Sequence, residues 1–112
     1  LFSLYINMFE PIIVYPFVYT LKLESGKYYV GITNNFNMRY SQHINGTGAN
    51  WTRMYKPIKI LAVCIGDINK ENEITLDMMK KHGFENVRGG NWCKVELKSN
   101  PLDKILDNSI DA

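Results

Sequence analysis

Two short stretches near the beginning of the chain are rich in aromatic and β-branched residues, which favour extended strands. They are residues 17–23 (FVYTLKL) and 27–33 (KYYVGIT), and residues 24–26 (ESG) separate them. A three-residue hairpin loop favours glycine at its third position, where the backbone turns left-handed, and Gly26 occupies that position. The pattern therefore predicts a β-hairpin.

The length of the turn determines which side chains of the hairpin share a face. A three-residue loop pairs Leu21 with Tyr29 and Tyr19 with Gly31, so both tyrosines point to the same side of the sheet. Gly31 then leaves open space opposite Tyr19, where a side chain would crowd that face. A two-residue turn at Ser25-Gly26 would shift the register by one residue and place the tyrosines on opposite faces. We expect the three-residue turn.

The pattern of apolar and polar positions predicts further elements along the chain. A helix is expected over residues 35–45, with Asn34 or Asn35 as its N-cap. The later elements are a buried strand (58–65), a helix (70–82) that ends at Gly83, a short strand (92–97) and a short helix (101–106). This order predicts an α/β (α+β) fold in which helices flank a small three-stranded, mostly antiparallel sheet. The predicted organisation is an N-terminal extension (1–16), one domain (17–97) and a C-terminal tail or short helix (98–112).

Composition restricts the class of protein. The 112 residues are 46% hydrophobic and 21% charged, which is typical of one globular domain. No apolar run reaches the ~18–20 residues of a membrane span, and Glu10, Pro11 and Pro16 interrupt the apolar beginning, which lacks signal-peptide features. Two cysteines, Cys64 and Cys93, are too few for a disulfide scaffold and fit a reducing compartment. We therefore expect an intracellular protein with no membrane partner.

The charges are unevenly distributed, although the net charge is only +2. Residues 20–60 hold six Lys or Arg residues and one acidic residue, a net charge of +5. Residues 61–112 hold seven basic and nine acidic residues. A basic first half indicates a face that contacts a polyanion. The alternative is a charged surface that is simply solvated.

The predicted helix 35–45 places functional residue types one turn apart. Phe36 and Tyr40 are four residues apart and form an aromatic stripe. Arg39 and His43 have the same spacing and form a separate, polar stripe. Together with the hairpin tyrosines, these residues resemble the GIY-YIG nuclease family. The matching positions are Tyr19 in residues 17–19, the segment 29–31 (YVG) with Tyr29, Arg39, His43 and Glu73. The resemblance covers about residues 17–90, although Phe17 stands where the family has glycine.

The segment after this helix points to one branch of the family. Residues 46–53 (GTGANWTR), followed by Pro57, look like the loop of the structure-selective, junction-cutting branch, here in a single-domain form. The sequence contains no counterpart of the zinc-binding module of some junction-cutting relatives. We therefore expect the shape of the DNA or a partner protein to direct the cut. The family's asparagine after the second helix matches Asn86 or Asn91, and both alternatives stay open.

The resemblance implies a metal-dependent endonuclease that hydrolyses phosphodiester bonds in DNA. One divalent cation, Mg²⁺ or Mn²⁺, would stabilise the leaving oxygen, and a single carboxylate is enough to hold a cation that keeps several waters. Glu73 is the expected metal ligand, with Glu71 and Asp77 as alternatives if the helix register differs. Arg39 would grip the phosphate, because a guanidinium can bind two of its oxygens at once.

The tyrosines are the candidate general bases. An unperturbed phenol has a pKa of ~10, so it is almost fully protonated at neutral pH. It needs either a nearby cation that stabilises phenolate or a concerted relay in which it passes its own proton onward. Tyr19 is the first choice and Tyr29 the second. His43 is expected to bind the phosphate, to orient a tyrosine or to accept the proton of water.

Residues outside this set are expected to contact the nucleic acid. Lys27, Arg53 and Lys56 would follow the DNA backbone, and Trp51 would stack on a base, although a core position is equally consistent with Trp51. The competing hypothesis is a non-catalytic nucleic-acid-binding module on the same fold. A cleavage assay with a metal titration separates these two functions.

Overall fold

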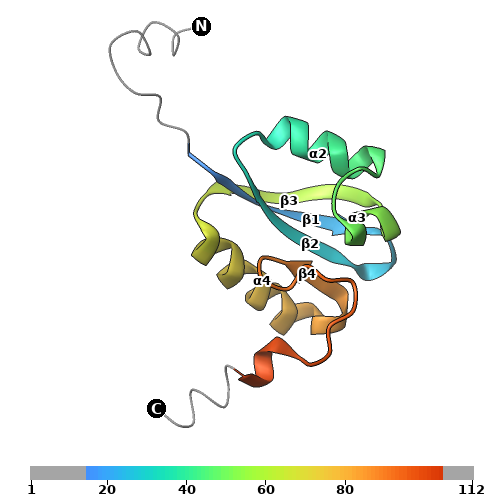
Figure 1. Ribbon diagram of the computed structural model, residues 1–112, viewed down its shortest axis with the longest axis vertical. Helices are drawn as coiled ribbons and strands as arrows, with labels where there is room; N and C mark the ends of the chain where they lie inside the picture. The colour runs from blue at the N-terminus through green and yellow to red at the C-terminus, as the bar shows by residue number, and fades with distance from the viewer. Residues whose placement is uncertain (1–14, 105–112) are drawn as a thin grey trace, which may run out of the picture.

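The computed structural model of the chain describes residues 15–104 (Figure 1). Its elements are, in chain order, β1 (Phe17–Leu23), the 3₁₀ turn η1 (Glu24–Gly26), β2 (Tyr28–Thr33), α2 (Phe36–Asn45), α3 (Asn50–Met54), β3 (Pro57–Ile65), α4 (Ile68–His82), the 3₁₀ turn η2 (Phe84–Asn86) and β4 (Val87–Gly89). The mixed α/β class and both predicted long helices are confirmed. None of the helices within residues 15–104 is long and apolar enough to cross a membrane.

The sheet has four strands in the order β3-β1-β2-β4, one more than predicted. Strand β1 is antiparallel to β2 and to β3, whereas β4 runs parallel to β2. The predicted hairpin register is confirmed, because Tyr19 lies opposite Gly31 and Leu21 lies opposite Tyr29. The left-handed backbone of Gly26, with a φ of 71°, closes the turn. Both tyrosines therefore lie on one face, here called the tyrosine face.

The prediction of a strand over residues 58–65 is confirmed, but the prediction that this strand is buried is wrong. Strand β3 occupies an edge of the sheet, and most of its residues are exposed, including Ile58 at 56% and Ile65 at 63%. A continuous apolar run is compatible with a central strand, but the run itself does not specify where in the sheet the strand lies. Here β1 takes the central place next to β3, because it pairs on both of its sides.

The prediction of a strand over residues 92–97 is also wrong. Only Trp92 pairs, in an isolated bridge with Gly89. The fourth strand is instead Val87–Gly89, which lies earlier in the chain. Its three residues include a glycine and an arginine, so they show no alternating apolar pattern to read. Residues 101–104 are helical, and the remainder of the predicted 101–106 helix lies outside the described residues.

Helices cover the sheet on both faces (Figure 1). On the tyrosine face, Phe36 of α2 packs edge-on against Tyr19, and Trp51 of α3 joins the same buried core cluster. On the opposite face, His82 of α4 stacks on Tyr28, with 4.1 Å between ring centroids. Side chains alternate along a strand, so Tyr28 and Tyr29 necessarily point to different helical layers.

Candidate active site

Tyr19 is the centre of the buried cluster on the tyrosine face. Its side chain is 1% exposed, and its hydroxyl lies 2.7 Å from Nε2 of His43. The ring of Tyr29 lies alongside, with 6.2 Å between centroids. A Cβ added at Gly31 would overlap the Tyr19 hydroxyl and come within 2.5 Å of Cζ. The glycine therefore provides the space that the phenol occupies.

Helix α2 brings His43 to both tyrosines. The helix begins after Asn35, whose side chain accepts a hydrogen bond from the Met38 N–H, and this satisfies one of the free donors of the first turn. His43 is fully buried, and its Nδ1 lies 2.7 Å from Oγ1 of Thr52. Burial, together with the charge of Arg39, lowers the pKa of His43 to about 4. The imidazole is therefore neutral at neutral pH.

Arg39 lies one helical turn before His43 and acts on both phenols. Burial raises the pKa of Tyr19 and of Tyr29 above the usual value, while the charge and the hydrogen-bond contact of Arg39 oppose that rise. The half-buried guanidinium also donates a 2.9 Å hydrogen bond to Oε1 of Gln42. Arg39 thus brings a fixed positive charge to the two hydroxyl groups.

The structure does not bring Glu73 to the tyrosines. The Glu73 side chain is 61% exposed and forms an ion pair with Lys70 at 3.6 Å. Glu71 is buried instead, and it shares the sheet-facing stripe of α4 with Thr75 and Met79. Two residues along a helix correspond to a rotation of about 200°, so only one of the two glutamates can face the sheet. Glu71 is one of the two alternatives, with Asp77, that the sequence offers if the helix register differs.

The negative charge of Glu71 acts electrostatically on the hydroxyl groups of both Tyr19 and Tyr29. It contributes to the raised pKa of Tyr19 and of Tyr29. Burial raises the pKa of the Glu71 carboxyl itself, and a hydrogen bond from the backbone of Gly90 acts in the opposite direction. Gly90 directly follows β4, so the carboxylate lies where that strand ends. Helix α4 packs on the other face of the sheet, and Glu71 therefore approaches the tyrosines from the end of β4.

Two of the expected nucleic-acid contacts are already engaged inside the protein. Trp51 is 3% exposed and donates a 2.9 Å hydrogen bond to the Tyr28 carbonyl, so it belongs to the core and is not available to stack on a base. Lys27 donates to Oδ1 of Asn86 at 2.8 Å and lies over the rings of Trp51 and Tyr55. The contact with Asn86 joins the residue that precedes β2 to the last residue of η2.

Arg53 and Lys56 are exposed, as expected for residues that contact DNA. The Arg53 guanidinium contacts the side chain of Asn50, and the backbone N–H of Lys56 donates to Glu24. The Lys56 contact uses only the backbone, so it does not occupy the ammonium group of the side chain. They are the basic residues of the expected set that remain accessible to a ligand.

The two candidate asparagines differ in position. Asn86 bonds to Lys27 and to the His82 carbonyl, so its side chain is used within the fold. Asn91 follows Gly90, the residue that bonds Glu71, and its backbone N–H donates to Asn72. Of the two, Asn91 is therefore the one that adjoins the buried carboxylate.

Sequence reasoning missed Arg88, which organises the segment around the site. Its side chain is 4% exposed and stacks on Trp51, 4.4 Å from the ring centroid. It donates to backbone carbonyls on both sides in the chain, at Phe84, Val87, Lys94 and Val95. A lone arginine beside two glycines carries no recognisable pattern, so no sequence signal identified it.

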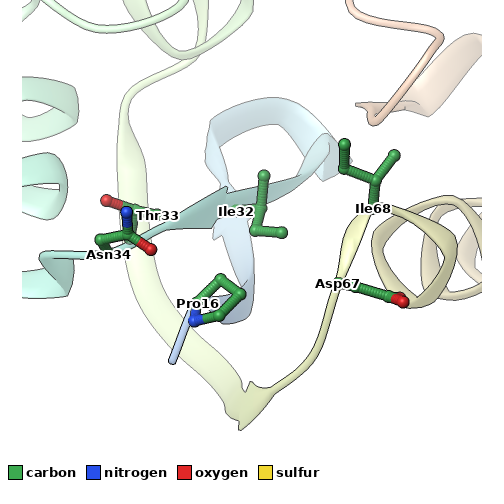
Figure 2. A pocket seen from close by; sticks show the side chains of 6 residues that line it. All are labelled: Pro16, Ile32, Thr33, Asn34, Asp67 and Ile68. Carbon is green, nitrogen blue, oxygen red and sulfur yellow. The ribbon is translucent and has the colours of Figure 1, made fainter. Parts of the chain in front are cut away.

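A cavity of about 450 Å³ lies between the end of β2 and the beginning of α4 (Figure 2). It is lined by Pro16, Ile32, Thr33, Asn34, Asp67 and Ile68. Ile32 follows Gly31 in β2, and Asp67 is the N-cap of α4, where it accepts from the Lys70 N–H. Its largest side chains are aliphatic, and none of the clustered site residues lines it.

The donor set restricts the kind of metal that fits. Within residues 15–104 there is no group of three or more His, Cys, Asp or Glu side chains that could enclose an ion. A hard cation that keeps most of its waters requires as little as one carboxylate. Glu71 is the carboxylate near the phenols, so a hydrated Mg²⁺ or Mn²⁺ fits these residues better than a metal enclosed by protein ligands.

The chain is similar to a known catalytic domain and to several bacterial proteins. Residues 15–86, more than half of the chain, match the GIY-YIG catalytic domain. A UPF0213 protein of Xanthomonas campestris pv. campestris (strain 8004) is 44% identical over 45 residues, which cover 40% of this chain and 44% of that protein. A UPF0213 protein of Fusobacterium nucleatum is 31% identical over 70 residues, covering 58% of this chain and 70% of that protein.

A UPF0213 protein of Streptococcus pneumoniae serotype 4 is 31% identical over 65 residues, or 58% of this chain and 65% of that protein. The matched segment thus spans less than half of the Xanthomonas relative. No solved structure matches the chain. The GIY-YIG domain is a nuclease domain, for which nucleic acid is the substrate class. On the extent of the domain match, this chain belongs to the GIY-YIG family of nucleases.

Proposed function

We propose that this domain is a metal-dependent endonuclease that hydrolyses phosphodiester bonds in DNA. The observation that carries the proposal is the buried hydrogen bond of 2.7 Å between Tyr19 and His43, next to the charge of Arg39. A phenol, a neutral imidazole and a guanidinium together can move a proton and hold an anion. A purely structural cluster does not require a half-buried arginine charge directed at two phenols.

Arg39 binds the scissile phosphate in this proposal. Its guanidinium is permanently charged, and two of its N–H groups can donate to two phosphate oxygens. The hydrogen bond to Gln42 restricts its rotation, so less conformational entropy is lost when the phosphate binds.

Tyr19 is the proposed proton relay. Burial raises the pKa of Tyr19, which makes free phenolate scarce at neutral pH and favours a concerted relay over a simple phenolate base. The phenol instead takes a proton from the attacking water while its own proton passes to His43. The charge of Arg39 contributes to the low pKa of His43, and a bound phosphate would neutralise that charge. His43 therefore becomes a better proton acceptor when the substrate is present.

Tyr29 stays the second choice for the relay. Its side chain is 7% exposed against 1% for Tyr19, so it lies slightly closer to solvent. It has no hydrogen bond of its own to His43 among the contacts of the described residues, although the two rings lie 5.0 Å apart. A relay through Tyr29 would therefore lack a direct proton acceptor.

Glu71, in place of Glu73, is the proposed ligand of one divalent cation, Mg²⁺ or Mn²⁺. The cation, when bound, would act as a Lewis acid that stabilises the leaving oxygen. The Gly90 N–H helps to orient the carboxylate, and a neighbouring cation would favour its ionised form over the neutral form that burial favours. Arg53 and Lys56 are proposed to contact the DNA backbone outside the site.

The preferred DNA is proposed to be branched. The support is the likeness of residues 46–53 to the loop of the junction-cutting branch, together with the basic segment 20–60. A positively charged surface binds any duplex through its phosphates, so shape has to supply the selectivity. A partner protein that directs the domain is the alternative source of selectivity.

The direct test compares branched, nicked and linear DNA in the presence of increasing Mg²⁺ or Mn²⁺. We expect cation-dependent cleavage that a chelator abolishes and that falls by about 10²–10⁴-fold in Tyr19→Phe, which has lost the relay hydroxyl. Thermal unfolding of the variant controls for folding. DNA binding without cleavage at any cation concentration would contradict the proposal and favour the non-catalytic binding module.

A further inference from the structure

The loop over residues 46–53 closes around the buried imidazole. Thr52 is fully buried, and its Oγ1 lies 2.7 Å from Nδ1 of His43. A Cβ added at Gly48 would come within 2.6 Å of the same nitrogen. One residue of this loop therefore bonds the ring and another packs closely against it. The site as proposed above assigns neither residue a role.

The hydrogen bonds around Thr52 indicate which ring nitrogen carries the proton. Thr52 Oγ1 also lies 3.0 Å from the carbonyl oxygen of Ala49, which can only accept. Two oxygens at that distance need a proton between them, so the single hydroxyl proton of Thr52 points to Ala49. Thr52 then accepts from His43, and Nδ1 is the protonated nitrogen.

The other end of the chain of hydrogen bonds follows from this tautomer. With Nδ1 protonated, Nε2 of His43 carries a lone pair and can only accept. The proton of Tyr19 is then free to be donated to Nε2 of His43, which is the unprotonated nitrogen of this tautomer. The donated protons thus follow one path from Tyr19 through His43 and Thr52 to Ala49.

We propose that Thr52 is a positioning residue that holds His43 in the tautomer with Nδ1 protonated, so that Nε2 can receive the proton of Tyr19. Gly48 supports this by allowing close packing on the ring. The catalytic consequence rests on the proposed function, whereas the tautomer itself does not. The segment expected from its sequence to contact DNA would then serve, at these two positions, to orient the proton acceptor.

The proton balance of the relay follows from this arrangement. One proton of water moves to the Tyr19 oxygen as the water oxygen bonds to phosphorus, and the original phenol proton moves to Nε2. The bond from phosphorus to the leaving oxygen breaks in the same displacement, and the leaving oxygen takes a proton from solvent. His43 becomes an imidazolium and keeps its Nδ1 proton, which continues to be donated to Thr52. The Thr52 and Ala49 dipoles are already aligned to stabilise that positive charge. His43 later returns the Nε2 proton through Tyr19 to solvent.

The test uses the full chain and separates a positioning role from a packing role. The nitrogen resonances of the His43 ring, observed by ¹⁵N NMR, report which nitrogen is protonated. We expect protonated Nδ1 in the wild type and in Thr52→Ser, and a shift toward protonated Nε2 in Thr52→Val, which keeps the shape but lacks the hydroxyl. Cleavage at saturating DNA should fall about 10- to 100-fold in Thr52→Val and stay near the wild-type rate in Thr52→Ser.

Thr20→Val is the matched control, because it makes the same change at a buried threonine of β1 that faces the opposite side of the sheet from Tyr19, and it should keep the wild-type tautomer and rate. A wild-type spectrum with protonated Nε2 would overturn the proposal even if Thr52→Val failed to fold. An unchanged tautomer and rate in folded Thr52→Val would overturn it as well. Absence of cleavage in every protein, with the expected NMR pattern, would instead refute the proposed function and leave the tautomer assignment intact.

Discussion

At the scale of single residues, His43 combines complete burial with a neighbouring positive charge. Both effects disfavour the imidazolium, and together they lower its pKa to about 4 from a usual value of 6.5. The unfolded chain therefore binds a proton in a pH range in which the folded chain does not. Protonation of this one ring links the stability of the fold to pH.

The sign of this linkage gives a prediction. Neutral His43 contributes stability that is fully present above pH 6.5 and is lost as the pH falls from 6.5 to about 4. Across that range the free energy of unfolding should fall by ~3 kcal/mol on account of this group. Urea unfolding of the wild type and of His43→Gln between pH 4 and 7.5 measures the effect as the difference between the two pH profiles.

The comparison isolates His43 because other titrating groups occur in both proteins. Glu71, whose pKa is raised, contributes with the opposite sign, and its contribution largely cancels in the difference. His82→Gln changes the other histidine, which is exposed, and controls for the general effect of replacing a histidine by glutamine. Parallel profiles for the wild type and His43→Gln would show that the buried ring does not titrate as described.

At the scale of elements, the hairpin of β1 and β2 is a part of the fold whose register the local sequence pattern predicts correctly. Its turn length fixed the pairing of Tyr19 with Gly31, and that pairing put both tyrosines on one face as predicted. Register follows from a local rule, because the turn and the two strands adjoin in the chain. The edge position of β3 depends instead on which strands pair with β1, and no local rule supplies that information.

Gly31 and Gly26 give a matched pair for testing this register. In Gly31→Ala the new methyl group meets the Tyr19 ring, so we expect a loss of ~1–3 kcal/mol in stability and a disrupted hydrogen bond to His43. In Gly26→Ala nothing lies within 4 Å, and only the left-handed backbone, with a φ of 71°, costs about 1–2 kcal/mol.

Both variants are therefore destabilised, but only Gly31→Ala should lose cleavage activity under conditions in which both are folded. Urea unfolding and a cleavage assay on the same preparations make the comparison. Equal activity in the two folded variants would show that the close approach of Gly31 to Tyr19 does not matter for the site.

For helix α4, the sequence pattern did not determine which of its carboxylates faces the sheet. Glu71 and Glu73 lie in one short acidic segment, and the apolar residues of α4 are too scattered to define its buried face. The stripe that faces the sheet contains a glutamate and a threonine besides Met79, so polar residues occupy positions that a hydrophobic pattern assigns to solvent. The family resemblance identified the helix, but only packing distinguishes the two carboxylates.

At the scale of the whole molecule, the candidate site draws on both layers of helices. Tyr19 and Tyr29 come from the central hairpin, Arg39 and His43 from α2 on one face, and Glu71 from α4 on the other (Figure 1). Arg88 helps to join these layers, since it stacks on Trp51 and holds carbonyls on both sides of itself in the chain. Such long-range contacts have no signature at the level of sequence.

The measurement that tests the account most directly compares Glu71→Gln with Glu73→Gln in a DNA cleavage assay with Mg²⁺. Glu71→Gln should lower the cleavage rate about 100-fold or more while DNA binding persists, because it removes the carboxylate charge near the phenols. Glu73→Gln changes an exposed side chain and should stay within about twofold of the wild type. An active Glu71→Gln, or an inactive but folded Glu73→Gln, would contradict the assembly of this site.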